Sequence, residues 1–168
     1  MSKRKVYGSL NNRVDENKMF CEKIEVGTGM TEYFWSDRHP YEVVQVKNQK
    51  HVFVRMLEHK GVGEPMSNTW ELYQKETNPI VEMKFRYGYW YKVSRCKYTD
   101  AVNRAIQLVE DGTCKNFNAA YNHVLYMNNI HFKTEKDVEE FKNGKEYINY
   151  HKANVSFGVA EYYFDYEF

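Results

Sequence analysis

The order of apolar and polar residues changes twice along the chain, and each change predicts a different kind of secondary structure. Between residues 24 and 97, short runs of alternating or consecutive β-branched and aromatic residues are separated by polar turns. Such runs are typical of short strands joined by tight connections. They cover residues 32–36, 41–48, 50–58, 69–76 and 81–95, and Gly88 interrupts the last run as a hairpin turn. We expect an antiparallel meander that curls into a small open barrel.

From residue 98 to residue 152 the period becomes helical. Apolar residues recur every three or four positions in three segments, which are residues 100–111, 117–130 and 134–144. Thr99 is the expected N-cap of the first helix, and Thr134 with Asp137 forms a capping pattern at the start of the third. This part of the chain therefore predicts two or three helices.

Strand texture returns at residues 155–168, which are mostly apolar and aromatic, so we expect a final strand docked in the sheet rather than a frayed end. The sequence thus predicts a single α+β domain over residues 1–168. Its β core, residues 24–97 and 153–168, is an antiparallel β-sheet of five or six strands or a small open barrel. A two- to three-helix insertion at residues 98–152 precedes the C-terminal strand, and residues 1–20 form a loose arm.

Charge and cysteine content exclude several classes of function. The 24 basic and 23 acidic side chains nearly cancel, which gives no support to nucleic-acid or membrane binding. The first twenty residues carry positive charge but no apolar run, and so predict neither a signal peptide nor a membrane anchor. Cys21, Cys96 and Cys114 lack the spacing of a zinc site or a disulfide framework, which indicates a reducing cytoplasm.

Aromatic residues are the unusual feature of the composition. They make up 17% of the chain, with 15 Tyr and 10 Phe. Tyrosine offers flat, rigid contact area with a hydrogen-bonding tip, which suits a small β-rich core as well as a recognition surface. Because so many rings leave an apolar face to be covered, we expect a homo-oligomer, and closed dimers are the commonest kind.

The familiar catalytic and cofactor motifs do not occur in the sequence. Gly27 and Gly29 are followed by neither Lys-Ser/Thr nor a helix, so they match no P-loop or dinucleotide fingerprint, although a glycine-rich turn can still face an anion. The six histidines have no metal-ligand spacing, and no nucleophile lies in a recognisable turn. The helix pair after residue 98 lacks the basic flanks of a DNA-reading motif. We therefore expect a protein that is not an enzyme and uses neither metal nor cofactor.

A set of arginines lies among aromatic residues in the β region. Arg38 follows Trp35 closely, Arg55 lies in "VFVRM", and Arg86 lies in "KFRYGYWY". Arginine can bind phosphate through two parallel hydrogen bonds, while an aromatic face can stack on a base. This combination favours a phosphorylated, base-containing ligand. The alternative is that the arginines are solvent-facing strand residues, with Trp35 and Trp90 in the core.

Several stretches, in order, resemble a family of small phage proteins, the Thoeris anti-defence proteins of the first type. They are "VGTGMTEYFWSDRHPYEVVQV", "HVFVR", "PMSNTWELY", "MKFRYGYWY" and "SFGVAEYYFDYEF". The resemblance covers most of residues 24–95 and 155–168. It departs from the family pattern at Met30, where alanine is usual, at "RYGYW", where Lys-Asn-Gly-Arg-Trp is usual, and at Ala160, where arginine is common.

The resemblance implies a phage sponge that sequesters a cyclic nucleotide immune signal in the host bacterial cytoplasm without cleaving it. The signal would be glycocyclic ADP-ribose, made by a Toll/interleukin receptor-type enzyme, and some members also bind cyclic di- or trinucleotides in a homodimer or hexamer. The expected ligand-binding residues are Trp35, Arg38, His39, Arg55, Phe85, Arg86, Trp90 and Tyr163, and a second site would use Gly27, Gly29, Met30 and Thr31. The alternative function is direct inhibition of a host defence enzyme by protein–protein binding.

Overall fold

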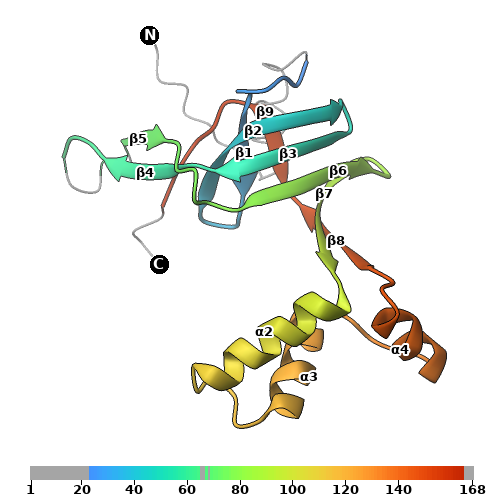
Figure 1. Ribbon diagram of the computed structural model, residues 1–168. Coiled ribbons are helices and arrows are strands. Elements are labelled where there is room, and N and C mark those ends of the chain that lie inside the picture. The colour runs from blue at the N-terminus through green and yellow to red at the C-terminus, as the bar shows by residue number, and fades with distance from the viewer. Residues whose placement is uncertain (1–22, 65–66, 68, 165–168) are drawn as a thin grey trace. The chain divides into compact units, whose positions relative to one another are not determined.

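The computed structural model describes residues 23–64, 67 and 69–164 (Figure 1). The predicted loose arm at residues 1–20 lies outside this range. The chain divides into two compact units, of which the first comprises residues 1–92 and 152–168 and the second residues 93–151. This division falls within a few residues of the predicted change from β to helical texture.

The fold is α+β, as predicted, with an antiparallel sheet and three described helices. The sheet has seven strands rather than the expected five or six, in the order β8-β7-β6-β3-β2-β1-β9. The strands are β1 (Gly29–Tyr33), β2 (Arg38–Asn48), β3 (His51–Met56), β6 (Ile80–Arg86), β7 (Tyr89–Cys96), β8 (Tyr147–Ala153) and β9 (Val155–Gly158). A separate ribbon pairs β4 (Glu58–Gly61) with β5 (Trp70–Tyr73).

Two strands differ from the prediction. β8 extends the sheet from within the predicted helical insertion, and its first four residues alternate in burial as a strand should. The predicted run at residues 50–58 divides into β3 and β4, and β4 belongs to the separate ribbon. The chain leaves the first unit along β7 and returns to it along β8.

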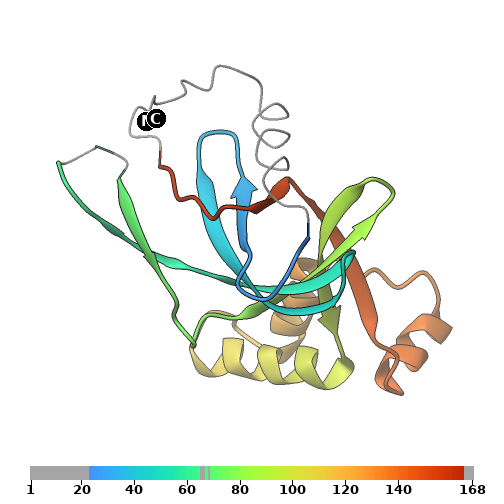
Figure 2. The same ribbon diagram turned by 90° about the horizontal axis from the view of Figure 1, so that it is seen from above.

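The strands of the first unit curl into a half-barrel around an apolar core (Figure 2). Val43, Val52, Val54 and Met83 lie on the inward face of β2, β3 and β6 and are almost fully buried. The β2–β3 register shifts between Val43 and Gln45 and again between Val46 and Asn48. Such irregularities bend a strand and increase its twist, which helps the sheet to curl.

The second unit packs three helices around its own core. They are α2 (Tyr98–Glu110), α3 (Phe117–Met127) and α4 (Glu135–Lys142). Their buried residues include Ala105, Leu108, Ala120, Val124 and Phe141. None of the described helices is long and apolar enough to span a membrane.

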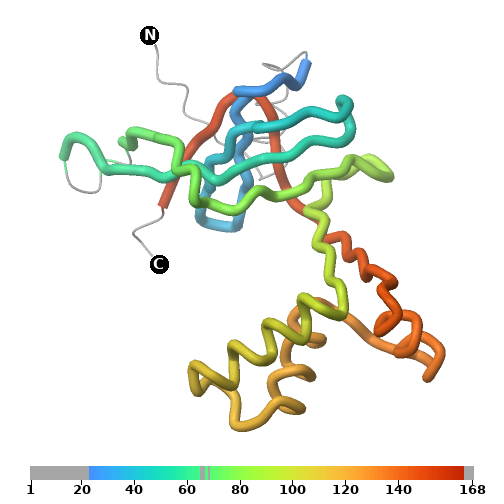
Figure 3. Tube along the Cα trace, in the orientation of Figure 1, coloured from blue at the N-terminus to red at the C-terminus, as the bar shows by residue number. Residues whose placement is uncertain are grey.

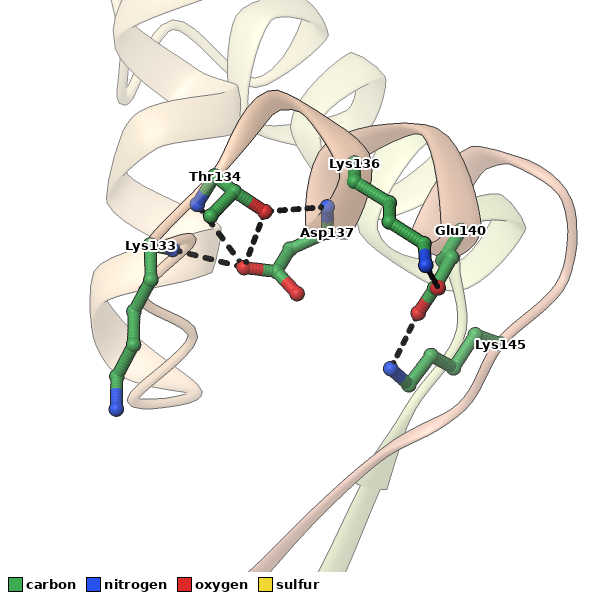
Figure 4. A network of polar contacts seen from close by, with 6 residues as sticks. All are labelled: Lys133, Thr134, Lys136, Asp137, Glu140 and Lys145. Carbon is green, nitrogen blue, oxygen red and sulfur yellow. Dashed lines mark hydrogen bonds and ion pairs between the residues drawn. The ribbon is translucent and has the colours of Figure 1, made fainter.

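The two predicted helix caps had different outcomes. The Thr134–Asp137 capping box is confirmed, because the Thr134 hydroxyl accepts from the Asp137 amide at 3.2 Å and Asp137 accepts from the Thr134 amide at 3.0 Å (Figure 4). The Thr134 hydroxyl also donates to the Asp137 carboxylate at 3.1 Å, and this bond, followed by the one from the Thr134 amide, lowers the pKa of Asp137. Thr99 as N-cap is wrong: α2 begins at Tyr98, two residues before the predicted start, and Lys97 occupies the cap position without a side-chain bond.

The C-terminal residues do not continue as one strand. β9 ends at Gly158, whose φ of 135° is open to glycine alone, and the following residues 159–164 leave the β9 ladder. We call residues 159–164 the tail. The tail runs beside the β1–β2 hairpin (Figure 3), and Tyr163 exchanges two backbone hydrogen bonds with Arg38, at 3.0 and 3.1 Å. The predicted strand over residues 155–168 is therefore correct only for its first four residues among those described.

Candidate functional site

A pocket of about 320 Å³ opens between the β6–β7 hairpin and β9. This volume is at the lower end of the range for small-molecule sites, which suits one ring system better than a whole dinucleotide. Its lining is mainly apolar and aromatic and consists of Ile24, Phe85, Gly88, Trp90, Val155, Ser156 and Phe157.

Three aromatic rings, those of Phe85, Trp90 and Phe157, line the pocket. The centroids of Phe85 and Trp90 lie 5.5 Å apart in an edge-to-face arrangement, and those of Trp90 and Phe157 lie 4.7 Å apart. The sequence predicted Phe85 and Trp90 as ligand-binding residues, and the structure brings them together. Phe157 was missed because its partner strand could not be known from local pattern, although it is apolar and lies in a predicted strand.

The turn between β6 and β7 sets the distance between the first two rings. Tyr87 and Gly88 both have positive φ, 50° and 82°, as in the two-residue turns that match the twist of a hairpin. Positive φ is unusual for a bulky residue such as Tyr87, which is 84% exposed. The short turn places Phe85 and Trp90 near the same end of the hairpin.

A buried polar cluster lies on the inward face close to these rings. The Glu32 carboxylate accepts hydrogen bonds from the Tyr41 hydroxyl at 3.0 Å and from the Lys92 ammonium at 2.6 Å. Burial, followed by the negative charge of Glu32, raises the pKa of Tyr41, which keeps its hydroxyl protonated as a donor. The sequence analysis missed this cluster. The sequence did contain one sign of it, because Glu32 lies two residues after Met30, and alternate residues of a strand lie on the same face, which here is the inward one.

The side chain of Arg38 binds the tail. Its guanidinium forms an ion pair with Glu161 at 2.7 Å and lies 5.3 Å from the ring centroid of Tyr163. Arg38 and Tyr163 therefore lie close together, as predicted, but the two side chains contact each other. A ligand phosphate at Arg38 would have to compete with Glu161.

The four residues expected to form a second site pack against the tail or the core. The Thr31 hydroxyl donates to the Val159 carbonyl at 2.7 Å and accepts from the Glu161 amide at 3.0 Å. Met30 is fully buried in the core. The Gly27 amide donates to the Val43 carbonyl at 2.8 Å, so it does not face an anion.

Gly29 is explained by close packing. A Cβ added to Gly29 would lie 2.5 Å from the backbone nitrogen of Ala160, in the tail. No side chain fits at that distance, so glycine is required for the tail to cross β1. The glycine-rich stretch thus has a structural role, which is to let the tail pass over β1.

One chain does not bring the three predicted arginines together. Arg55 pairs with Ile80 across β3 and β6, and Arg86 lies six residues beyond Ile80 on β6, which is about 20 Å at the usual rise per strand residue. Arg55 also lies opposite Glu42, four residues from Arg38 on β2, or about 13 Å. A phosphate site shared by all three would need more than one copy of the chain.

The other two predicted residues lie at the β1–β2 connection. Trp35 is 93% exposed, so the alternative that places it in the core is wrong, whereas Trp90 packs against the core cluster. His39 contacts the ring of Phe34 at a centroid distance of 4.7 Å and faces Tyr162 at 6.4 Å. Tyr162 in turn stacks on His59, whose pKa is lowered chiefly by burial.

Comparison of the chain with protein-family models, with curated proteins and with solved structures gives no match.

Proposed function

We propose that this protein is a phage anti-defence sponge, which binds a cyclic nucleotide immune signal in the host cytoplasm and holds it without cleaving it. The observation that carries the proposal is the pocket lined by Phe85, Trp90 and Phe157. The resemblance to the Thoeris anti-defence proteins of the first type suggests glycocyclic ADP-ribose as the ligand.

The pocket fits the base of such a ligand. Stacking of one base on an aromatic side chain contributes about 1–3 kcal/mol. The phosphates would lie outside the pocket, because no charged side chain is among its lining residues. Of the three predicted arginines, Arg86 is the closest in the chain to the pocket, since it follows Phe85 directly.

The required affinity exceeds what stacking alone supplies. Depletion of a scarce signal calls for nanomolar binding, or about 12 kcal/mol. Each charge-assisted hydrogen bond to a phosphate contributes about 1.5–3 kcal/mol. Several such donors are therefore needed in addition to the aromatic rings, and a second copy of the chain could supply some of them.

The proposal is tested by calorimetric titration of glycocyclic ADP-ribose isomers and of cyclic di- and trinucleotides. We expect at least one ligand to bind and to be recovered intact after the protein is denatured by heat. Phe85→Leu should weaken binding at least tenfold. Phe53→Leu is the matched control, because Phe53 is also half-buried on a strand but lies against Lys47 and outside the pocket lining. Failure of every ligand to bind, or its recovery as a cleaved product, would contradict the proposal.

A second candidate function is direct inhibition of a host defence enzyme, and the exposure of Trp35 favours it. Trp35 is 93% exposed at the tip of a hairpin, next to the half-exposed Phe34. Tryptophan is enriched among residues that dominate binding energy at protein interfaces. If this function is correct, Trp35→Ala should abolish co-purification of a host protein, whereas it should leave nucleotide binding in the pocket unchanged.

A further inference from the structure

The Glu32–Lys92 pair is unusual in being both charged and enclosed by the half-barrel. The side chain of Glu32 is 7% exposed and that of Lys92 is 29% exposed. Both hydrogen bonds to Glu32 fall on the same oxygen, Oε2, which accepts from Tyr41 and from Lys92. Among the described residues, none donates to the other oxygen, Oε1.

Each member of the pair lies next to a residue that lines the aromatic pocket. Glu32 on β1 lies directly opposite Val155 on β9, and Val155 lines the pocket. Directly opposed residues of antiparallel strands have side chains on the same face, with Cβ atoms about 5 Å apart. Lys92 lies two residues after Trp90 on β7, and alternate residues of a strand share a face. Glu32 and Lys92 therefore lie on the same face of the sheet as Val155 and Trp90 and next to them, just outside the pocket lining.

Stability alone gives little reason for a charged pair at this position. Removal of two charges from water is costly, and well-packed apolar side chains of similar size are often equally stable in their place. The neighbouring inward positions hold such residues, Met30 and Phe157. A carboxylate oxygen with no donor among the described residues, next to an ammonium with two further protons to donate, suits instead a ligand with a donor beside an acceptor.

We propose that Glu32 and Lys92 recognise the hydrogen-bonding edge of a nucleobase stacked in the aromatic pocket. This inference rests on the proposed function, and it identifies the base as adenine. The exocyclic amino group of adenine donates to Glu32 Oε1, and the adjacent ring nitrogen accepts from Lys92 Nζ. Tyr41 acts as a positioning residue, because its hydroxyl holds the same carboxylate through Oε2.

The decisive experiment compares two ligands that differ by one donor. Glycocyclic ADP-ribose and its purine analogue, in which hydrogen replaces the adenine amino group, are titrated into the wild-type protein. Loss of a hydrogen bond to a charged acceptor should weaken binding of the analogue by about ten- to a hundredfold. Equal affinity for the two ligands would overturn the inference and leave the sponge proposal standing.

Variants then identify the residues that are responsible for the preference for glycocyclic ADP-ribose over its purine analogue. Glu32→Met with Lys92→Met removes both charges and leaves neither one buried alone, so we expect a folded protein that binds the two ligands equally. Glu32→Gln should recover part of the preference, because its amide oxygen still accepts. Glu82→Met is the control, since Glu82 is similarly buried and ion-paired with Lys84 at 3.4 Å but lies on the opposite face of β6 from Phe85.

The outcomes separate the two proposals. If the double variant retains the wild-type preference, Glu32 and Lys92 have only a structural role. If the wild type binds only cyclic nucleotides that contain no adenine, the assignment of adenine at this pair is wrong while sequestration survives. If the wild type binds no nucleotide, both proposals fail together.

Discussion

Replacement of Gly29 by alanine should destabilise the protein, because it forces the tail away from β1. The added Cβ would lie 2.5 Å from the Ala160 nitrogen and 3.0 Å from the Val159 carbonyl carbon. Both are backbone atoms, which cannot rotate aside as a side chain can. Overpacking of this kind costs about 1–3 kcal/mol.

Displacement of the tail would also break the two hydrogen bonds of Thr31 to Val159 and Glu161. Each such bond contributes about 0.5–1.5 kcal/mol, so we expect Gly29→Ala to lower the free energy of unfolding by about 2–6 kcal/mol in total. That is a large fraction of the roughly 5–15 kcal/mol typical of a folded protein. Urea unfolding followed by tryptophan fluorescence measures the change.

Gly61→Ala is the matched control for this experiment. Gly61 also lies in a strand, but a Cβ there would approach the Trp70 ring at 3.4 Å, which is near ordinary contact with a side chain. We expect its free energy of unfolding to stay within about 0.5 kcal/mol of the wild type. Thr31→Val should destabilise the wild type and have a smaller effect in the Gly29→Ala background, because the tail is already displaced there. Wild-type stability of Gly29→Ala would refute the account of the tail.

Three further predictions concern other parts of the molecule. Thr134→Ala should lower stability by about 1 kcal/mol in thermal unfolding, whereas Thr99→Ala should have no such effect because Thr99 caps nothing. The pKa of Tyr41 in the folded state is raised above its ordinary value of 10.0, so its contribution to folding stability is complete below pH 10 and is lost as the pH rises further. Tyr41→Phe should therefore reduce the loss of stability at alkaline pH, which urea unfolding at a series of pH values measures. Light scattering at micromolar concentration should give a dimer or hexamer, and a clean monomer would rule out the expected assembly.

The sequence by itself determined the kinds of element and much of their position. Alternation along residues 41–48 specified a half-buried strand, and the spacing of Thr134 and Asp137 specified the start of α4. These signals are local, since strand period and helix capping depend on residues only a few positions apart. For the same reason, the sequence was sufficient to predict the fold class and to single out Phe85 and Trp90, which lie on either side of one tight turn.

Only the tertiary structure decided which distant residues meet. Glu32 and Lys92 are 60 positions apart, and their contact depends on the curl of the sheet and the register of its strands. Arg55 and Arg86 looked equivalent in sequence, yet they lie toward opposite ends of the β3–β6 pair because register fixes their separation along the strands. Gly29 resembled part of an anion-binding loop until the tail was seen to cross it. A local pattern specifies the face on which a side chain lies, whereas the pairing of strands and the path of the tail determine what that face meets.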